Sequence, residues 1–303
     1  MIVLVAFVNI AVVPLLLMGV IRKIKARMQN RVGSPVLQPF HDVGKLLRKG
    51  ETVSQTASWV FSLAPRLNLA VVTVAALLVP WSGAVFPDAW GPATNLLFVI
   101  YLLGLGKFVS MLAAMDTGSA FGGLGASRDA FISVLVEPAL MMGLGALALG
   151  AKSLDLSAIY AASGSESVAV LVGVAFVIIA LAELSRMPVD DPTTHLELTM
   201  VHEAMILENS GRNLALVELS VALRTCIFFG LAAQTFLLAV PAYVGLPEPA
   251  RYGVGLCALF AMGIAVGVAE GVLVKLNWRR VPNFIAFAIA LSLMAALIAV
   301  ARG

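Results

Sequence analysis

The residues of this sequence that could do chemistry are charged side chains placed in apolar surroundings. Six of them lie within or at the ends of long apolar runs: Glu137, Glu183, Glu218, Glu270, Lys107 and Arg224. A charge at the centre of a bilayer costs at least about 2.5–3.5 kcal/mol, so such groups are expected to face the protein interior and to have partners. Burial and neighbouring cations shift carboxylate pKa values in opposite directions, which allows such groups to take up and release protons. The sequence leaves two interpretations open: a buried polar file that carries protons, or static ion pairs that fix the register of the helices.

The elements that must position these charges are membrane-spanning helices. Of the 303 residues, 60% are apolar and only 12% are charged, whereas soluble domains have about 45–50% apolar and about 25% charged residues. This composition excludes a soluble enzyme, a disordered protein and a disulfide scaffold. It predicts an all-α polytopic membrane protein with a single transmembrane domain over residues 1–303. Eight spans are expected, at about 1–21, 67–85, 94–115, 131–150, 167–184, 214–240, 252–276 and 283–301.

The basic residues predict how the spans are oriented. Loops on one side carry fifteen Lys and Arg residues, nine of them between residues 22 and 66. Loops on the other side carry only Lys152, Arg251 and Arg302. Because Lys and Arg are enriched in cytoplasmic loops, we expect the fifteen to lie in the cytoplasm and both termini to lie outside a cell inner membrane.

The basic loop 22–66 is long enough to carry structure of its own. Phe40, Val43, Leu46 and Leu47 recur there at helical spacing, with charged residues between them. This pattern predicts a short amphipathic helix that lies along the membrane surface. A simple anchor to anionic lipid explains the pattern equally well.

The loop 185–213 is acidic. Thr194, followed three residues later by Glu197, forms a capping box, and Pro192 favours the first turn of a helix. A helix is therefore expected to start here and to stop at Gly211. This helix would present five polar side chains on the cytoplasmic side: His195, Glu197, His202, Glu203 and Glu208.

The sequence predicts that this chain binds no metal. On one helix, His195 and His202 would stand about 10 Å apart along the axis. The pair His202-Glu203 is not followed by a histidine at position 206, so the HExxH zinc motif is absent. Cys226 and Cys257 lie in apolar segments without CxxC spacing, which favours a packing role. Any redox metal is therefore expected in another subunit.

Two glycine patterns are interpreted as packing features. The run FGGLGASRD (121–129) follows a membrane span and lacks the GxxxxGK[ST] pattern, so we expect a tight turn between spans and no nucleotide-binding loop. Gly263, Gly267 and Gly271 are spaced by four in one span, which would let a neighbouring helix approach closely.

Three stretches resemble the respiratory complex I subunit 1 family. QNRVGSPVLQPFHDVGKLLRKGE (29–51) is similar to the basic first-loop signature of that family. AELSRMPVDDPTTHLELTMVHEAMILENSG (182–211) resembles its acidic loop, and more closely the version found in the membrane subunits of formate hydrogenlyase and hydrogenase-4. DTGSAFGGLGASRDAFISVLVEP (116–138) also favours this hydrogenase branch. The resemblance covers much of the first two thirds of the chain.

The resemblance implies roles for particular residues. Glu183 and Arg186 occupy the Glu-x-x-Arg positions of the family, and Arg128 and Glu137 match an Arg and a Glu that bracket the start of the fourth helix. In the family such groups border the connection between the redox arm and a chain of buried protonatable residues. The acidic-loop positions are Asp190, Asp191, Glu197, Glu203 and Glu208. The first-loop positions are Gln29, Arg31, Gln38, Pro39, Asp42 and Lys45, and all of these except Pro39 are expected to dock other subunits.

The function implied by the resemblance is that of a membrane anchor and ion-coupling subunit in a membrane-bound nickel–iron hydrogenase. The chain would be part of an oxidoreductase complex and would hold no redox cofactor or complete active site. Expected partners are the nickel–iron hydrogenase large and small subunits, an iron–sulfur subunit and antiporter-like membrane subunits, with no nucleic acid. The nickel–iron site and the iron–sulfur clusters would lie in partners, and their electron transfer would be linked to proton or sodium movement.

Two alternatives stay open. One is a quinone-site subunit of a complex I-type NADH dehydrogenase. The complex I loop is richer in glycine and glutamate than 182–211, which has two histidines, and the first loop lacks GPN before RVG; these departures put quinone binding in doubt. The other is an autonomous secondary transporter, although the chain shows no convincing internal repeat of the kind such proteins have.

Overall fold

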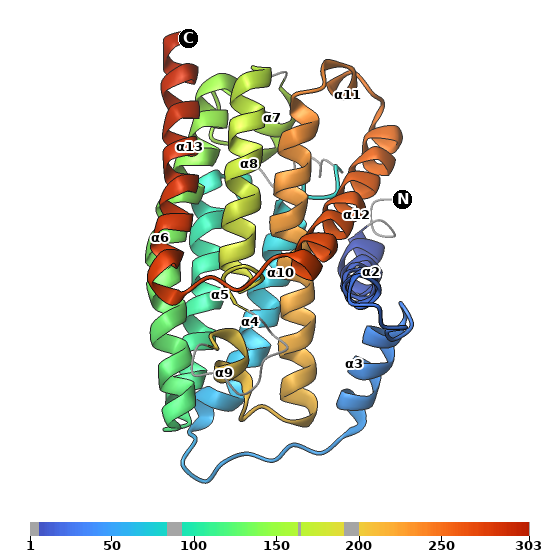
Figure 1. Cartoon of the computed structure of the whole chain (residues 1–303), viewed down its shortest axis with the longest axis vertical. Coiled ribbons are helices and arrows are strands. Elements are labelled where there is room, and N and C mark those ends of the chain that lie inside the picture. The colour runs from blue at the N-terminus through green and yellow to red at the C-terminus, as the bar shows by residue number, and fades with distance from the viewer. Residues whose placement is uncertain (1–5, 84–92, 163–164, 191–199, 303) are drawn as a thin grey trace.

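The protein is a bundle of long helices with short helices near both ends (Figure 1). The computed structural model describes residues 6–83, 93–162, 165–190 and 200–302, and the regular elements in these ranges are helices. In chain order they are the π-helical turn η1 (Val8–Val12), α2 (Val13–Met28), α3 (Gln38–Arg48), α4 (Trp59–Leu78), α5 (Leu96–Asp116), α6 (Ala120–Ala151), α7 (Leu156–Ala161), α8 (Glu166–Glu183), α9 (His202–Ile206), α10 (Gly211–Leu238), α11 (Pro241–Val244), α12 (Glu248–Val272), the 3-10 turn η3 (Trp278–Arg280) and α13 (Val281–Arg302).

Seven helices in the described part of the chain are long and apolar enough to cross a membrane: α4, α5, α6, α8, α10, α12, and α13 together with η3. They confirm the all-α polytopic fold and correspond to seven of the eight expected spans. The first expected span, 1–21, appears as η1 followed by α2, which runs on to Met28, and residues 1–5 lie outside the described part. The protein is therefore a multi-pass membrane protein.

α10 lies at the centre of the bundle, where it packs against α2, α3, α4, α8 and α12. At the contact with α8, a Cβ on Gly173 would lie 2.9 Å from the Phe236 ring of α10, and Ile227 and Phe229 of α10 are each at most 1% exposed. Because lipid is as apolar as these side chains, helices in a membrane associate mainly through close packing. Close packing requires small residues at the contacts.

Glycines provide such a contact between α12 and α2. A Cβ on Gly263 would lie 2.6 Å from Leu17 Cδ1, and a Cβ on Gly271 would lie 2.5 Å from Met28 Cβ. Gly267 packs in the same way against α2. The packing role expected for the three glycines is confirmed.

The fourth span begins earlier than expected. α6 starts at Ala120, where the hydroxyl of Ser119 accepts a hydrogen bond from the N–H of Gly122 and caps the helix. The glycine run 121–129 is therefore helical, and the prediction of a tight turn there was wrong; the turn lies at 117–119. The glycines make room for neighbouring backbone instead, since a Cβ on Gly125 would lie 2.8 Å from the Val201 carbonyl oxygen.

The prediction of a helix stop at Gly211 was also wrong. Gly211 begins α10, with a φ of +50°, and a Cβ there would overlap the Gly50 carbonyl oxygen. Glycine is therefore favoured where the two long loops meet. α9 covers only His202–Ile206, and the capping box of Thr194 and Glu197 lies outside the described residues.

α3 forms where the spacing of apolar residues in the first loop predicts a helix. Val43 is buried, and Phe40 and Leu46 are half-buried in a cluster with residues of α2 and α10. Leu47 is 43% exposed and does not belong to this apolar face, contrary to expectation.

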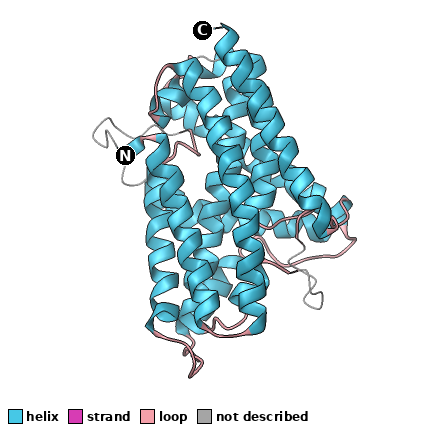
Figure 2. Cartoon of the chain, turned by 90° about the vertical axis from the view of Figure 1, so that its left-hand side faces the viewer, coloured by secondary structure: helices cyan, strands magenta, loops and turns pink. Residues whose placement is uncertain are grey.

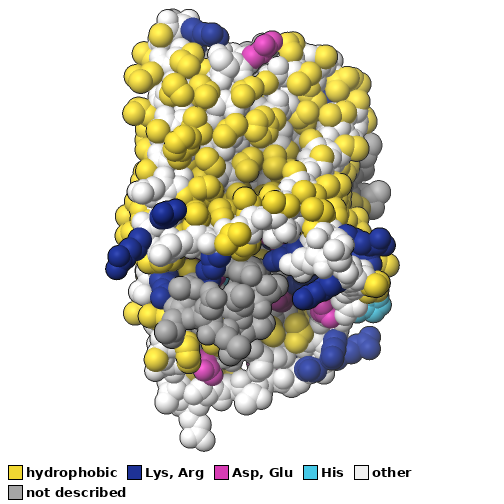
Figure 3. Space-filling model, in the orientation of Figure 1, with side chains coloured by type: hydrophobic (Ala, Val, Ile, Leu, Met, Phe, Trp, Pro, Cys, Tyr) yellow, Lys and Arg dark blue, Asp and Glu magenta, His cyan; other side chains and the backbone are white. Residues whose placement is uncertain are grey.

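The two ends of the bundle differ in surface chemistry. α3, α9 and the loop 49–58 lie at the lower end in Figure 1, called the basic end below, and α7, α11 and the end of α13 lie at the upper end, called the far end. Figure 3 shows an apolar surface over the upper part of this face and a belt of basic side chains beneath it. In the side view of Figure 2, loops gather at the ends of the long helices.

Candidate buried ionic site

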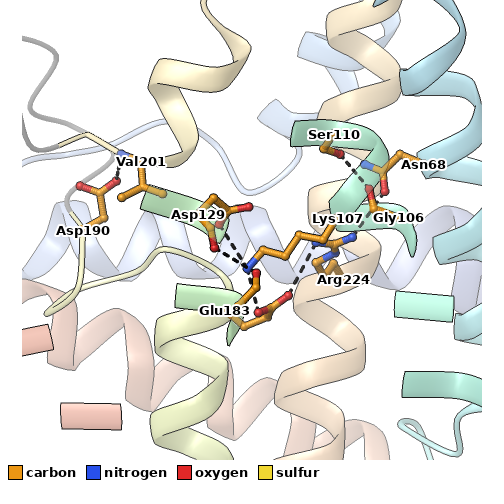
Figure 4. Close-up of polar contacts among 10 residues, drawn as sticks. Asn68, Gly106, Lys107, Ser110, Asp129, Glu183, Asp190, Val201 and Arg224 are labelled. Atoms are coloured by element: carbon orange, nitrogen blue, oxygen red, sulfur yellow. Dashed lines mark hydrogen bonds and ion pairs between the residues drawn. The ribbon is translucent and has the colours of Figure 1, made fainter. Parts of the chain in front are cut away.

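Four helices each bring one ionisable side chain to a buried cluster, shown in Figure 4. Lys107 of α5 lies between Asp129 of α6 and Glu183 of α8, with its Nζ 3.2 Å from Asp129 Oδ1 and 2.8 Å from Glu183 Oε2. Arg224 of α10 adds a longer ion pair, with Nη1 3.8 Å from Glu183 Oε1. Lys107 and Asp129 are 4% and 2% exposed. These four residues are called the central cluster below.

The central cluster is balanced, with two cations and two carboxylates, and this balance allows the charges to be buried. Removing one member would leave an uncompensated charge, which typically costs about 3–5 kcal/mol. Asn68 of α4 extends the cluster, because its Oδ1 lies 3.4 Å from the Arg224 Nη2 that donates to it. Gly106 leaves space for this contact, since a Cβ there would lie 2.8 Å from Asn68 Oδ1.

The end of α8 directs two charged residues to different places. Ser185 adopts a left-handed conformation with a φ of +48°, and the N–H of Arg186 donates to the Leu181 carbonyl oxygen at 2.9 Å. This hydrogen bond closes the helix C-terminus in the same way as a common capping motif. Glu183 therefore stays in the central cluster, and Arg186 joins a second set of ions.

The second set lies between α2, α12 and the turn after α8. Arg186 Nη1 is 2.9 Å from Glu270 Oε1, and Lys25 Nζ is 3.8 Å from Glu270 Oε2. Glu270 is 5% exposed, and the Arg186 guanidinium also lies 5.7 Å from the centroid of the Phe229 ring. Glu183 and Glu270 therefore have different partners. The six charged residues of the spans do not form one continuous row, which is the arrangement that a single buried file for protons would need.

Glu218 belongs to a third group, at the junction of α2, α3 and α10. Arg22 Nη2 is 3.5 Å from Glu218 Oε2, and Arg22 Nη1 is 3.5 Å from Asp42 Oδ2; the three side chains are 36–43% exposed. The Nε2 of Gln38 donates to Asp42 Oδ1 at 2.8 Å. These residues thus tie α3 to the bundle.

Glu137 lies on the outer side of α6 and is exposed. A Cβ on Gly104 would lie 3.1 Å from Glu137 Oε1, so the carboxylate lies against the backbone of α5. Glu137 is eight residues beyond Asp129, about 12 Å further along α6 toward the far end, and it interacts electrostatically with Glu183 and Lys107. It is linked to the central cluster and is open to a neighbouring molecule.

A cavity of about 60 Å³ extends from the central cluster to the acidic loop. One water molecule needs about 10–15 Å³ of such space, so a few water molecules fit. Besides the four charged residues, the polar side chains of Asn68, Ser110, Ser185, His202, Asn209 and Ser220 line this cavity. These polar groups stand among apolar side chains such as Pro65, Leu184 and Val217, and they could bind a short chain of water molecules.

The acidic loop is held in place by two charged residues. Asp190 is 2% exposed, accepts a hydrogen bond from the Val201 N–H at 2.9 Å and pairs with Lys275 at 2.9 Å. Arg128 Nη1 donates to the Met200 carbonyl oxygen at 3.2 Å. These contacts fix the described parts of the loop against α6 and the segment after α12.

The other candidate residues lie outside the central cluster, although His202 lines the cavity beside it. His202 and Glu203 are half-buried, and Glu208 is exposed, as are Gln29, Arg31 and Lys45 of the first loop. Asp191, His195 and Glu197 lie outside the described residues. In the described ranges, no group of three or more His, Cys, Asp and Glu side chains is arranged to hold a metal ion.

Sequence reasoning missed Asp129 and Asn68. Asp129 lay in a segment that was expected to be a turn. With α6 extended back to Ala120, Asp129 belongs to a buried stripe in which positions recur every three or four residues: Gly122, Gly125, Asp129, Ile132 and Val136. A charge within a buried stripe is the signal that could have revealed it. No sequence feature distinguishes Asn68.

Comparisons with known proteins agree with this architecture. The family model described as NADH dehydrogenase matches residues 1–302. Hydrogenase-4 component C of Escherichia coli (strain K12) is 33% identical over 223 residues, which cover 72% of this chain and 69% of the relative. Formate hydrogenlyase subunit 4 of the same organism is 30% identical over 239 residues, 77% of this chain and 75% of the relative. An NADH-quinone oxidoreductase subunit of Anoxybacillus flavithermus is 29% identical over 238 residues, 75% of this chain and 69% of the relative.

A solved structure shares the fold. A chain of the membrane-bound sulfane sulfur reductase, an archaeal respiratory membrane complex, superposes with a TM-score of 0.80 at 20% identity, over 98% of this chain and 97% of that chain. Its helices are thus arranged in the same way over nearly the whole length. The family match over residues 1–302 and the relatives at 30% identity or more confirm the expected family. The chain belongs to the NADH dehydrogenase subunit 1 family.

Proposed function

We propose that this chain is the membrane anchor and ion-coupling subunit of a membrane-bound nickel–iron hydrogenase of the formate hydrogenlyase or hydrogenase-4 type. The relatives named hydrogenase-4 component C and formate hydrogenlyase subunit 4 support this proposal. The observation that carries it is Lys107, shared by Asp129 and Glu183 inside a membrane-spanning bundle. The soluble subunits, which would hold the nickel–iron site and the iron–sulfur clusters, dock at the basic end on the cytoplasmic side of the inner membrane.

The central cluster responds to charge because its members share partners. A proton added to Glu183 Oε2 removes the attraction of that oxygen for Lys107 Nζ, now 2.8 Å away, and leaves Lys107 with Asp129. Charges interact more strongly inside the protein than in water, since the effective dielectric constant is lower. An electron that arrives in a subunit docked against the acidic loop therefore attracts a proton through the cavity that opens toward His202 and Asn209.

The proton leaves the central cluster toward the outer surface of α6. Between Arg224 and Gln234, over about 15 Å, α10 is buried, and apart from Thr225 and Cys226 its side chains there are apolar. This stretch closes the direct route for a proton along α10 to the far end. Glu137 offers another exit, because it is coupled to Glu183 and lies on the outer surface of α6. A carboxylate on the surface of a span is costly in bare lipid. A neighbouring, antiporter-like membrane subunit therefore covers it and moves protons or sodium ions.

Glu183→Gln and Glu137→Gln in the intact complex test this proposal. Both replacements keep the side-chain size and remove the charge. Ion translocation, measured in proteoliposomes during hydrogen evolution, is expected to fall at least tenfold while the complex stays assembled. Glu248→Gln is the matched control, since Glu248 is exposed at the start of α12, away from the central cluster and the acidic loop, and should leave translocation unchanged. Wild-type translocation in both test variants would reduce the role of the chain to that of an anchor.

A quinone-site subunit of a complex I-type NADH dehydrogenase is the second candidate. It is favoured by the similarity to the NADH-quinone oxidoreductase subunit of Anoxybacillus flavithermus. Purification of the intact complex separates the two. A co-purifying subunit with nickel–iron ligands and hydrogen evolution supports the first candidate, whereas NADH-oxidising subunits and quinone reduction support the second.

A further inference from the structure

A groove on the membrane-facing surface near the far end has the features of a lipid site. Two cavities of about 270 Å³ and about 710 Å³ lie there. Both are lined by Ala146, Leu149 and Lys152, near the end of α6, and both extend to α13. The shared residues show that the two cavities are parts of one groove.

The larger cavity has an apolar floor of small residues. Gly145, Ala146 and Ala148 of α6 face Ala296 of α13 across it. A Cβ on Gly145 would meet nothing within 4 Å, so the groove is open at this point. Since α6 and α13 pack against each other, the floor is fixed. Such a furrow on a membrane span fits an acyl chain.

The smaller cavity has a basic rim. Lys152 and Arg302 both line it and are both exposed, and Arg302 Nη1 donates to the hydroxyl of Ser165. Ser165 is the residue before α8, and its side chain does not accept a hydrogen bond from the N–H groups in the first turn of that helix. A helix N-terminus attracts anions through these N–H groups. Glu166 is exposed nearby and does not line the cavity.

We propose that this groove binds an anionic phospholipid. The phosphate lies between Lys152, Arg302 and Ser165, and one acyl chain follows the floor between α6 and α13. Charge complementarity favours this occupant, because two cations stand beside an apolar furrow where a span ends. Figure 3 shows a small basic patch at the upper end of this face, beside the apolar surface and near an acidic side chain. The proposal does not depend on the proposed function.

Lipid retention tests the site. The intact complex is reconstituted in nanodiscs of phosphatidylcholine with a minor fraction of phosphatidylglycerol, and the lipid that stays bound after detergent exchange is measured by mass spectrometry. The wild type is expected to retain phosphatidylglycerol preferentially. One basic residue near a membrane surface strengthens the binding of anionic lipid about fivefold. The double variant Lys152→Gln/Arg302→Gln should therefore lower this retention at least tenfold, whereas Lys152→Arg should keep it.

The apolar half of the site has its own test. Gly145→Phe fills the floor and leaves both cations in place, so it should lower phosphatidylglycerol retention as the double variant does. Gly253→Phe is the matched control: a Cβ on Gly253 of α12 also meets nothing within 4 Å, and the residue is exposed. The proposal is overturned if the wild type shows no preference for phosphatidylglycerol, or if the double variant retains as much as the wild type. Crosslinking from Gly145→Cys to another subunit would also overturn it, because a protein would then occupy the groove.

Discussion

The polar groups inside this bundle are of two kinds, one toward each end. The central cluster consists of formal charges from four helices. The far end has mostly neutral groups: the Tyr160 and Thr235 hydroxyls are 3.0 Å apart, and the Tyr243 hydroxyl donates to Gln234 Oε1 at 2.6 Å. We call these four residues, together with Asn9, Ser82 and Tyr252, the far-end network. Arg251 borders it and donates to the Tyr160 carbonyl oxygen at 2.8 Å.

Only the charged region is expected to respond to electron transfer. Neutral hydrogen bonds fix helices in place and change little when a charge appears elsewhere, whereas a set of shared ion pairs rearranges when one member gains a proton. The apolar stretch of α10 after Arg224 separates the two regions. We therefore expect ion movement to depend on the central cluster, and the far-end network to close the opposite side of the bundle.

The largest expected effect is that of Lys107→Met, which would leave Asp129 and Glu183 without their shared cation. Because all three side chains are at most 8% exposed, the free energy of unfolding should fall by about 3–5 kcal/mol. Chemical unfolding in mixed micelles measures this change. Lys49→Met is the control, since Lys49 is exposed at the basic end. If Lys107→Met lowers the free energy of unfolding no more than Lys49→Met does, the buried ion pairs of the central cluster do not stabilise the protein.

Gly230→Ala probes the far end with a steric change. Its Cβ would lie 2.5 Å from the Trp81 carbonyl oxygen, and overpacking of this kind typically costs about 1–3 kcal/mol. Ion translocation by the assembled complex should stay at the wild-type level, because no ionic contact changes. Gly253→Ala, in open space, should cost nothing. If Gly230→Ala abolished ion translocation, ion movement would depend on the far end as well as on the central cluster, contrary to the proposal.

A pair of substitutions at Gln234 and Tyr243 tests whether the far-end network is neutral and replaceable. Gln234→Leu leaves the Tyr243 hydroxyl buried without its acceptor, which should lower the free energy of unfolding by about 1–3 kcal/mol. The double variant Gln234→Leu/Tyr243→Phe should recover most of this loss, since both polar partners are gone and Gln234 Nε2 already lacks a hydrogen-bond partner. Thermal unfolding of the single and double variants measures the coupling. An equal loss in both variants would contradict a neutral, replaceable network.

The smallest expected effect concerns pH. Burial raises the pKa of Tyr160, and it raises the pKa of Tyr243 despite the nearby Arg251. Because the pKa of each tyrosine is higher in the folded state, its contribution to stability is fully present below the ordinary pKa of about 10. This contribution is lost as the pH rises through the higher pKa of the folded state. The far-end network should thus stay intact from pH 5 to about 10. Tyrosinate absorbance of the wild type minus that of Tyr160→Phe measures this, and ionisation of Tyr160 at the ordinary pH would contradict it.

The sequence predicted the spans better than the contacts between them. Long apolar runs establish a membrane helix by length and composition alone, and the spacing of Gly263, Gly267 and Gly271 correctly indicated a close helix contact. The start of α6 was missed because glycines usually mark turns in soluble chains, whereas in membrane helices they are common contact residues.

The candidate site was predicted only in part, for a related reason. Lys107, Glu183 and Arg224 were identified because charges in apolar runs are conspicuous. Their pairing was not, because partners on different helices have no fixed spacing in the sequence. Glu183 and Glu270 were grouped because both lie in apolar runs, although they belong to different ion sets on the two sides of the turn after α8.

The turn at Ser185 also makes the two buried ion sets mechanically dependent on each other. Glu183 is bound to α5 and α10 on one side of the turn, and Arg186 is bound to α12 on the other, with two residues of backbone between them. Asp190, four residues further on, is held by Lys275 and by the Val201 N–H. A subunit that displaces the acidic loop therefore pulls on both sets through the same short piece of chain. Force applied at the surface would reach the membrane interior by this path even without any change of charge.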